Sequence, residues 1–145
     1  MPAKPIPEGH NAVSPYLVTR PAAKVIEFLK QTFDAQVLFV MNTPNGDVGH
    51  AEVKIADSIV MLSDGSPEHP PAATCIHVYV ADVDATYRRA IAAGGAPVRE
   101  PADQFYGDRS GGVKDAGGNQ WWISTHKEDL TSEELERRAK AAGRA

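Results

Sequence analysis

The sequence predicts an α+β fold built from two copies of one βαβββ module. Over residues 12–63, a short strand, an amphipathic helix and three further strand patterns follow one another, and residues 74–125 repeat that order. Residues 64–73 (DGSPEHPPAA), which contain three prolines, separate the two halves as a linker. An order of elements that occurs twice indicates an internal duplication. We therefore expect two curved mixed sheets around a shared cavity, with one helix covering the outer face of each sheet.

The first module follows a proline-rich arm over residues 1–11, which we expect to be extended and loosely held. A strand over residues 12–18 places Ser14, Tyr16 and Val18 on one face. Thr19 is a plausible N-cap for the helix that follows, and Pro21 suits its first turn. The helix carries an apolar stripe at the spacing of an α-helix, formed by Ala22, Val25, Ile26, Leu29 and Phe33.

Three strands complete this module, over residues 36–41, 50–55 and 59–63, with a breaker-rich loop over residues 42–47. In the middle strand, His50, Glu52 and Lys54 alternate with small apolar residues. Side chains in a strand alternate between the two faces of the sheet. His50 and Glu52 are therefore predicted on the face opposite the helix.

The second module begins with a strand over residues 75–80, in which Cys75, His77 and Tyr79 share one face. Asp82 is the expected N-cap of a helix that ends at Gly94-Gly95. After a strand near residues 96–99, residues 109–125 form a hairpin whose turn is DAGGN, residues 115–119. Alternation in its second strand places Trp121 in the core and Trp122 on the cavity face.

A C-terminal tail over residues 126–145 lies outside the duplication. Thr131 and Glu134 form a capping box, and Leu130 with Leu135 forms a hydrophobic staple. The apolar stripe of the helix that follows is narrow, so the helix is expected either to dock on the body of the protein or to fray.

Composition excludes several classes of function. A net charge of −4 argues against a nucleic-acid partner, because phosphate binding needs a basic surface. No apolar run approaches the length of a membrane span, and the first residues do not form a signal peptide. Cys75 is the single cysteine, so an intrachain disulfide is excluded. We expect a cytoplasmic protein without a membrane partner.

The final hairpin also carries a family resemblance. Gly107, Arg109, Asp115, Gly118 and Asn119 form the pattern G-x-R…D-x-x-G-N before an apolar strand. This pattern resembles the last hairpin of the vicinal oxygen chelate superfamily of glyoxalases, bleomycin-resistance proteins and extradiol dioxygenases. The resemblance covers about residues 12–125, looks closest to the bleomycin-resistance and PhnB-like branch, and implies the paired βαβββ fold.

The resemblance also identifies the positions that hold a metal in metal-dependent members, where the first and last strands of each module supply the ligands. The matching positions here are Ser14, Met61, Cys75 and Trp122. None is histidine, aspartate or glutamate, the residues that a borderline or hard divalent cation prefers. We therefore predict neither a metal nor another cofactor.

The predicted cavity wall combines aromatic, soft apolar and polar side chains, a mixture typical of small-molecule sites. Arg109 matches the family's hairpin arginine and either faces the cavity mouth or pairs with Asp108 or Asp115. The candidate ligand-binding residues are Tyr16, His50, Glu52, Met61, Cys75, His77, Tyr79, Arg109 and Trp122.

Three hypotheses of function remain open at this point, so the sequence does not decide whether the protein is an enzyme. The first is a metal-independent protein that binds a small aromatic or amphipathic molecule. The second is a metal-dependent lyase, isomerase or dioxygenase with a shifted site at His50, Glu52 and His77. The third is a metal-free enzyme with His77 as general base. Relatives of this length commonly dimerise, so a homodimer is expected.

Overall fold

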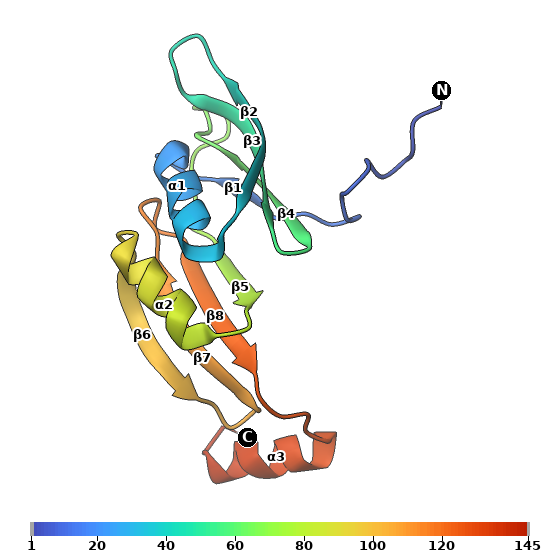
Figure 1. Cartoon of the computed structure of the whole chain (residues 1–145), viewed down its shortest axis with the longest axis vertical. Helices are drawn as coiled ribbons and strands as arrows, with labels where there is room; N and C mark the ends of the chain where they lie inside the picture. Colours follow the sequence, from blue (N-terminus) through green and yellow to red (C-terminus); the bar gives the residue numbers. More distant parts are fainter. Residues whose placement is uncertain (1, 145) are drawn as a thin grey trace.

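The computed structural model describes residues 2–144 and contains two four-stranded sheets, each covered on one face by a helix (Figure 1). The first module consists of β1 (Tyr16–Val18), α1 (Ala22–Phe33), β2 (Gln36–Asn42), β3 (Val48–Ile55) and β4 (Ser58–Ser63). The second consists of β5 (Cys75–Tyr79), α2 (Val83–Ala92), β6 (Ala96–Asp103), β7 (Asp108–Lys114) and β8 (Gln120–His126). The helix α3 (Ser132–Ala141) follows.

The two sheets have the same topology, which confirms the α+β fold of two βαβββ modules. Their strand orders are β1-β4-β3-β2 and β5-β8-β7-β6. In each, the first strand pairs in parallel with the last, and the other pairings are antiparallel. The parallel register places Tyr16 opposite Met61 in the first module and His77 opposite Trp122 in the second. These two pairs are therefore equivalent positions of the duplication.

The hydrophobic core lies between the helices and the sheet faces that they cover. Trp121 is completely buried there, and its ring centroid lies 5.6 Å from that of Phe33. The remaining core side chains come from both modules, and they include Leu17, Val25, Leu29, Val53, Leu62, Val113 and Ile123. Trp121 therefore belongs to the core, as the alternation in the sequence predicts.

The two helix starts are capped differently. The carboxylate of Asp82 accepts a hydrogen bond from the Ala85 N–H (3.1 Å), as predicted for α2. The prediction that Thr19 caps α1 is wrong, because the buried Asp64 carboxylate accepts the Ala22 N–H (2.9 Å) in its place. The Thr19 hydroxyl instead accepts a hydrogen bond from the Asn119 side-chain amide (2.9 Å).

The D-x-x-G-N turn between β7 and β8 joins the two modules. The Asp115 carboxylate accepts hydrogen bonds from Gly117 N–H (2.8 Å), Asn119 N–H (3.0 Å) and Trp121 Nε1 (2.7 Å). Asn119 is completely buried; its amide donates to Thr19 of the first module, and its carbonyl accepts the Thr74 N–H (3.0 Å). A Cβ at position 117 would overlap the Thr19 hydroxyl, so this position requires glycine.

The helices α1 and α2 pack against each other, side by side (Figure 1). Because each helix covers one face of its own sheet, the uncovered faces of the two sheets point away from this helix layer. One chain therefore does not enclose the predicted shared cavity between its two sheets. We call these uncovered surfaces the first and second open faces.

Helix α3 lies beyond the strand ends of the second module (Figure 1) and buries none of its residues. Thr131 caps it by accepting the Glu134 N–H (3.1 Å), as predicted. Arg138 ties it to the preceding segment through an ion pair with Glu128 (2.7 Å). Over residues 2–144, no helix is both long and apolar enough to cross a membrane.

Candidate functional site

The first open face brings together four of the predicted site residues, which come from β1, β3 and β4. Glu52 is paired across the strands with Met61, and Tyr16 lies beside Met61 on the other side. The Tyr16 hydroxyl and the His50 Nδ1 are 3.1 Å apart, and the His50 Nε2 lies 3.0 Å from a Glu52 carboxylate oxygen. Tyr16, His50 and Glu52 therefore form one hydrogen-bonded chain.

A fifth residue, His10, completes this chain from the N-terminal arm. Its Nε2 lies 2.8 Å from the second carboxylate oxygen of Glu52, so each oxygen of Glu52 has an imidazole partner. These hydrogen bonds lower the pKa of Glu52, and the bond to Glu52 raises the pKa of His10. The arm is thus attached to the first open face, whereas the sequence favoured a loose terminus. No periodic pattern in the sequence links His10 to a strand forty residues later.

This attachment predicts a pH dependence of the arm. The pKa of His10 is raised above 6.5 by its bond to Glu52. The stabilisation that His10 gives to the attached arm is therefore complete below pH 6.5 and is lost as the pH rises through the raised pKa. The pKa of Glu52 is lowered below 4.5, so its contribution is complete above that pH and is lost as the pH falls through the lowered value. The arm is therefore held most firmly between about pH 4.5 and pH 6.5.

Methyl NMR order parameters of Ala12 and Val13, recorded from pH 5.5 to pH 9, measure this attachment. We expect both residues to become more mobile at the upper end of that range, and His10→Ala to make them mobile throughout. His69→Ala, which removes an exposed histidine from the linker, is the control and should change nothing. Equal mobility of the wild type and His10→Ala at pH 6 would refute the attachment.

The second open face carries Cys75, His77 and Tyr79 on β5 and Trp122 on β8. The first three are exposed. The His77 Nε2 lies 3.0 Å from the buried Ser124 hydroxyl, and the centroid of the His77 ring lies 4.8 Å from that of Tyr79, with the two rings tilted by 58°. The four residues therefore share the face on which the sequence placed them.

Tyr79 connects this face to a second polar chain. Its hydroxyl donates to the buried Asp108 carboxylate (2.9 Å), whose other oxygen lies 2.7 Å from the His126 Nδ1. The hydrogen bond to Asp108 raises the pKa of Tyr79, and the carboxylates of Asp108 and Asp129 raise that of His126. Tyr79 is therefore held in its protonated form. Neither the hydrogen bond between Tyr79 and Asp108 nor a role for His126 was predicted from the sequence.

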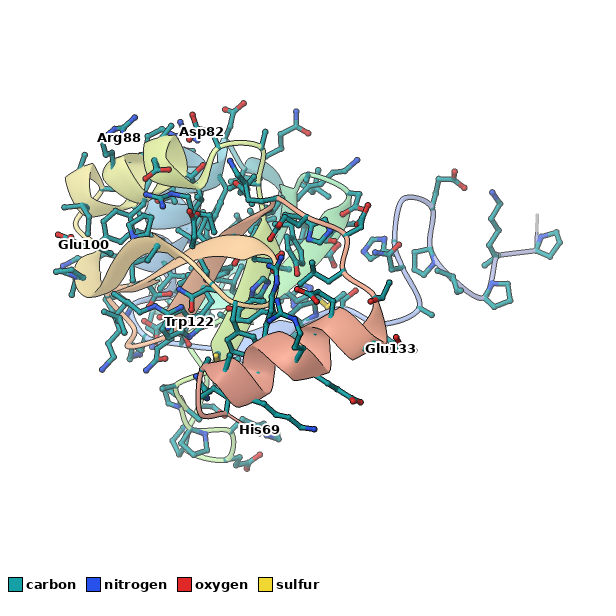
Figure 2. All side chains as sticks on the ribbon, turned by 90° about the horizontal axis from the view of Figure 1, so that it is seen from below. His69, Asp82, Arg88, Glu100, Trp122 and Glu133 are labelled. Atoms are coloured by element: carbon teal, nitrogen blue, oxygen red, sulfur yellow. The ribbon has the colours of Figure 1, made fainter. Side chains whose placement is uncertain are left out.

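Trp122 lies across the sheet and against a glycine. Gly112 is its cross-strand partner on β7, and a Cβ there would come within 2.7 Å of the indole. On the next strand, β6, Arg99 is paired with Gly112, and its guanidinium carbon lies 4.7 Å from the Trp122 ring centroid. Figure 2 shows Trp122 on the side of the sheet away from α2. Arg99 was not among the predicted site residues, because it stands in no motif.

Arg109 lies on the other side of the second sheet, away from the other candidates. Its guanidinium forms ion pairs with Asp84 of α2 (2.8 Å) and with Asp103 of β6 (3.3 Å). The predicted alternatives, a place at the cavity mouth or a pair with Asp108 or Asp115, are therefore both wrong. Arg109 fastens the helix to the sheet, and Asp84 was missed as its partner because the two residues are far apart in sequence.

The side chains at the family's metal positions do not fit a divalent cation. Met61, Cys75 and Trp122 offer a thioether, a thiol and an indole, and only the thiol becomes a strong ligand on deprotonation. Within one chain, the alternative metal site at His50, Glu52 and His77 is split between two faces, because His50 and Glu52 lie on the first module and His77 on the second. Within residues 2–144, no group of three or more His, Cys, Asp and Glu side chains is arranged to hold a metal ion.

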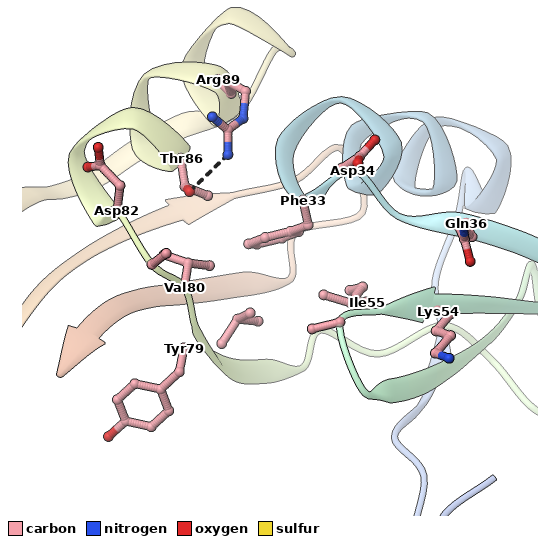
Figure 3. Close-up of a pocket in the computed structure, with 13 residues that line it drawn as sticks. Phe33, Asp34, Gln36, Lys54, Ile55, Tyr79, Val80, Asp82, Thr86 and Arg89 are labelled. Carbon is pink, nitrogen blue, oxygen red and sulfur yellow. Dashed lines mark hydrogen bonds between the residues drawn. The ribbon is translucent and has the colours of Figure 1, made fainter. Parts of the chain in front are cut away.

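A cavity of about 600 Å³ lies elsewhere, at the junction of the two modules near the helices (Figure 3). Phe33, Lys54, Tyr79 and Arg89 are among its lining residues. The Arg89 guanidinium donates hydrogen bonds to the Thr32 carbonyl (3.2 Å) and to the Thr86 hydroxyl (3.0 Å). The bond to Thr32 links α2 to α1. This cavity is therefore part of the joint between modules, and of the predicted site residues only Tyr79 reaches it.

Comparison with known proteins agrees with this fold. The family model of the Glyoxalase/Bleomycin resistance protein/Dioxygenase superfamily matches residues 10–123. The chain belongs to this superfamily. An uncharacterized protein of Mycobacterium tuberculosis is 35% identical to this superfamily member over 136 residues, which cover 86% of this chain and 80% of the relative.

Solved structures share the architecture. TnmS3, an antibiotic binding protein from Streptomyces sp. CB03234, superposes with a TM-score of 0.62 at 24% identity, covering 81% of this chain and 100% of TnmS3. The PhnB protein from Bacillus cereus gives a TM-score of 0.65 at 17% identity, covering 79% of this chain and 99% of its own. At these identities the likeness shows the fold, and the two open faces have to be interpreted from their own residues.

Proposed function

We propose that the protein binds and sequesters a small aromatic or amphipathic molecule, without a metal, between the open faces of two copies of the chain. The observation that carries the proposal is the exposure of aromatic side chains on both open faces. Tyr16 and Phe39 on the first face are 46% and 50% exposed, and Tyr79 on the second is 60% exposed. Large aromatic groups gathered on one surface are typical of a binding site.

The edge strand β2 supports a second copy as the other wall of the site. Its five consecutive apolar residues, Val37 to Met41, are each 39–52% exposed. An exposed, apolar edge strand of this length is a liability that monomeric proteins avoid. A second copy that covers β2 would remove it.

The duplication gives this dimer a simple geometry. Since both open faces point away from the helix layer, the first open face of one copy can cover the second open face of the other. A two-fold axis then produces two identical cavities. Each cavity would combine Tyr16, Phe39 and Met61 of one copy with His77 and Trp122 of the other.

The comparisons favour the same class of function. TnmS3 is described as an antibiotic binding protein, and the superfamily includes bleomycin resistance proteins. The polar groups of the open faces are arranged for binding more than for catalysis. Both Glu52 oxygens already have imidazole partners, and the Tyr79 hydroxyl donates to Asp108. The lowered pKa of Glu52 makes its carboxylate a weaker base, and the raised pKa of Tyr79 keeps its hydroxyl protonated.

Isothermal titration calorimetry tests the proposal, with planar aromatic compounds as probes, because its signal does not depend on either tryptophan. We expect the wild type to bind such probes and Trp122→Ala to bind them about five- to tenfold more weakly, since lost stacking is worth about 1–1.5 kcal/mol. Trp122→Phe, which keeps a ring, should retain part of the affinity. Failure of the wild type to bind any aromatic probe, or equal affinity in Trp122→Ala, would contradict the proposal.

A further inference from the structure

The second open face carries a cation that has no acidic partner. Arg99 is exposed on β6, and within residues 2–144 it makes no ion pair. Lys114, two residues beyond Gly112 on β7, lies on the same face and is likewise without an ion pair in that part of the chain. This concentration of positive charge is unexpected in a chain with a net charge of −4.

The position of Arg99 is built into the sheet. Arg99, Gly112 and Trp122 are neighbours on β6, β7 and β8. Gly112 leaves the space that the indole occupies, and the guanidinium lies over that indole at 4.7 Å. Stacking on an aromatic ring restrains the guanidinium and leaves its N–H edge free to donate hydrogen bonds.

The carboxylates of the two open faces cannot neutralise this cation within one chain, because they are already engaged. Asp108 is bound by Tyr79 and His126, and Glu52 is bound by His10 and His50. Asp108 and Glu52 therefore have partners of their own, whereas the Arg99 guanidinium forms no ion pair within residues 2–144. An acidic group on the ligand would complete the pairing.

We infer that the ligand is a planar aromatic anion, either an aromatic carboxylate or an ionised phenol. Its acidic group would accept the two parallel N–H bonds that a guanidinium offers, and its ring system would stack beside Trp122. This inference rests on the proposed function and adds the charge of the ligand to it. Arg99 is then a residue that determines specificity, and the Trp122 ring holds its guanidinium in place.

A matched pair of probes tests the inference on the full chain: anthracene-2-carboxylate and the neutral anthracene-2-carboxamide. We expect the wild type to prefer the carboxylate by about tenfold or more, as for a charge-assisted bidentate contact. Arg99→Met should remove the preference and leave the affinity for the amide nearly unchanged. Arg88→Met makes the same change of charge on the exposed surface of α2 and should keep the preference (Figure 2).

The outcomes separate this inference from the proposed function. Equal binding of both probes, unchanged in Arg99→Met, would refute the anionic ligand and leave the binding function in place. If neither the carboxylate nor the amide bound to the wild type, both the inference and the proposed binding function would be refuted. Sedimentation and thermal melting of Arg99→Met show whether it still folds and dimerises. A variant that becomes monomeric would assign Arg99 to the dimer interface and would also overturn the inference.

Discussion

Replacing Trp121 with alanine is expected to lower the free energy of unfolding by about 3–5 kcal/mol, as for other large buried truncations. The side chain is completely buried, packs on Phe33 of α1, and donates its indole N–H to Asp115. Its loss would leave both a cavity in the core and a buried carboxylate oxygen without that donor. Since a domain of this size is stabilised by only about 5–15 kcal/mol, the variant should be close to unfolding at ambient temperature.

The adjacent Trp122 provides the control. It lies on the open face, where it contacts Gly112 and Arg99 and hydrogen-bonds Gln120 (3.2 Å). We expect Trp122→Ala to lower the free energy of unfolding by only about 1 kcal/mol, the scale of an exposed cation–π contact. Urea unfolding followed by circular dichroism measures both variants. If Trp122→Ala proved the more damaging of the two, the assignment of the open face would be wrong.

Replacing Asp115 with alanine is the second change with a large expected effect, about 3 kcal/mol of unfolding free energy. Its buried carboxylate accepts hydrogen bonds from Gly117, Asn119 and Trp121. Removal leaves several buried donors without an acceptor, and each unsatisfied group costs about 1–3 kcal/mol. Because Asn119 also bonds Thr19 and Thr74, the loss should loosen the contact between the modules as well as the turn.

A double-mutant cycle isolates the indole bond within this effect. Trp121→Phe keeps a ring but removes the N–H donor, so Asp115→Ala should cost less in that background than in the wild type. The urea midpoints and slopes of the four proteins give the coupling. Equal costs in both backgrounds would show that the Asp115 carboxylate does not hold Trp121.

The fold could be predicted from the sequence because its determinants are local and periodic. Helical stripes, strand alternation and breaker-rich turns give the order of elements, and the order repeats. The same alternation separated Trp121 from Trp122 correctly, since a strand has only two faces. Asp82 was found as a cap because capping depends on residues three positions apart.

The remaining features depend on contacts between distant residues. Thr19 had the right chemistry for a cap, but Asp64 reaches the helix start from the end of β4. His10 and Arg99 stand in segments without a periodic pattern, so nothing local indicated Glu52 or Trp122 as their partners. The packing of α1 on α2 decides where the open faces point, and no property of either helix alone determines that packing.

The central claim is that each binding site is shared between two chains, and subunit complementation tests it most directly. Tyr16→Ala alters the first open face and Trp122→Ala alters the second, so each homodimer has two defective cavities. If the cavities form between copies, a mixed dimer has one cavity with both faces intact. After subunit exchange, the mixture should regain about a quarter of the wild-type binding sites for anthracene-2-carboxylate, because about half the dimers are mixed. A mixture that exchanges subunits yet regains no binding would contradict the account.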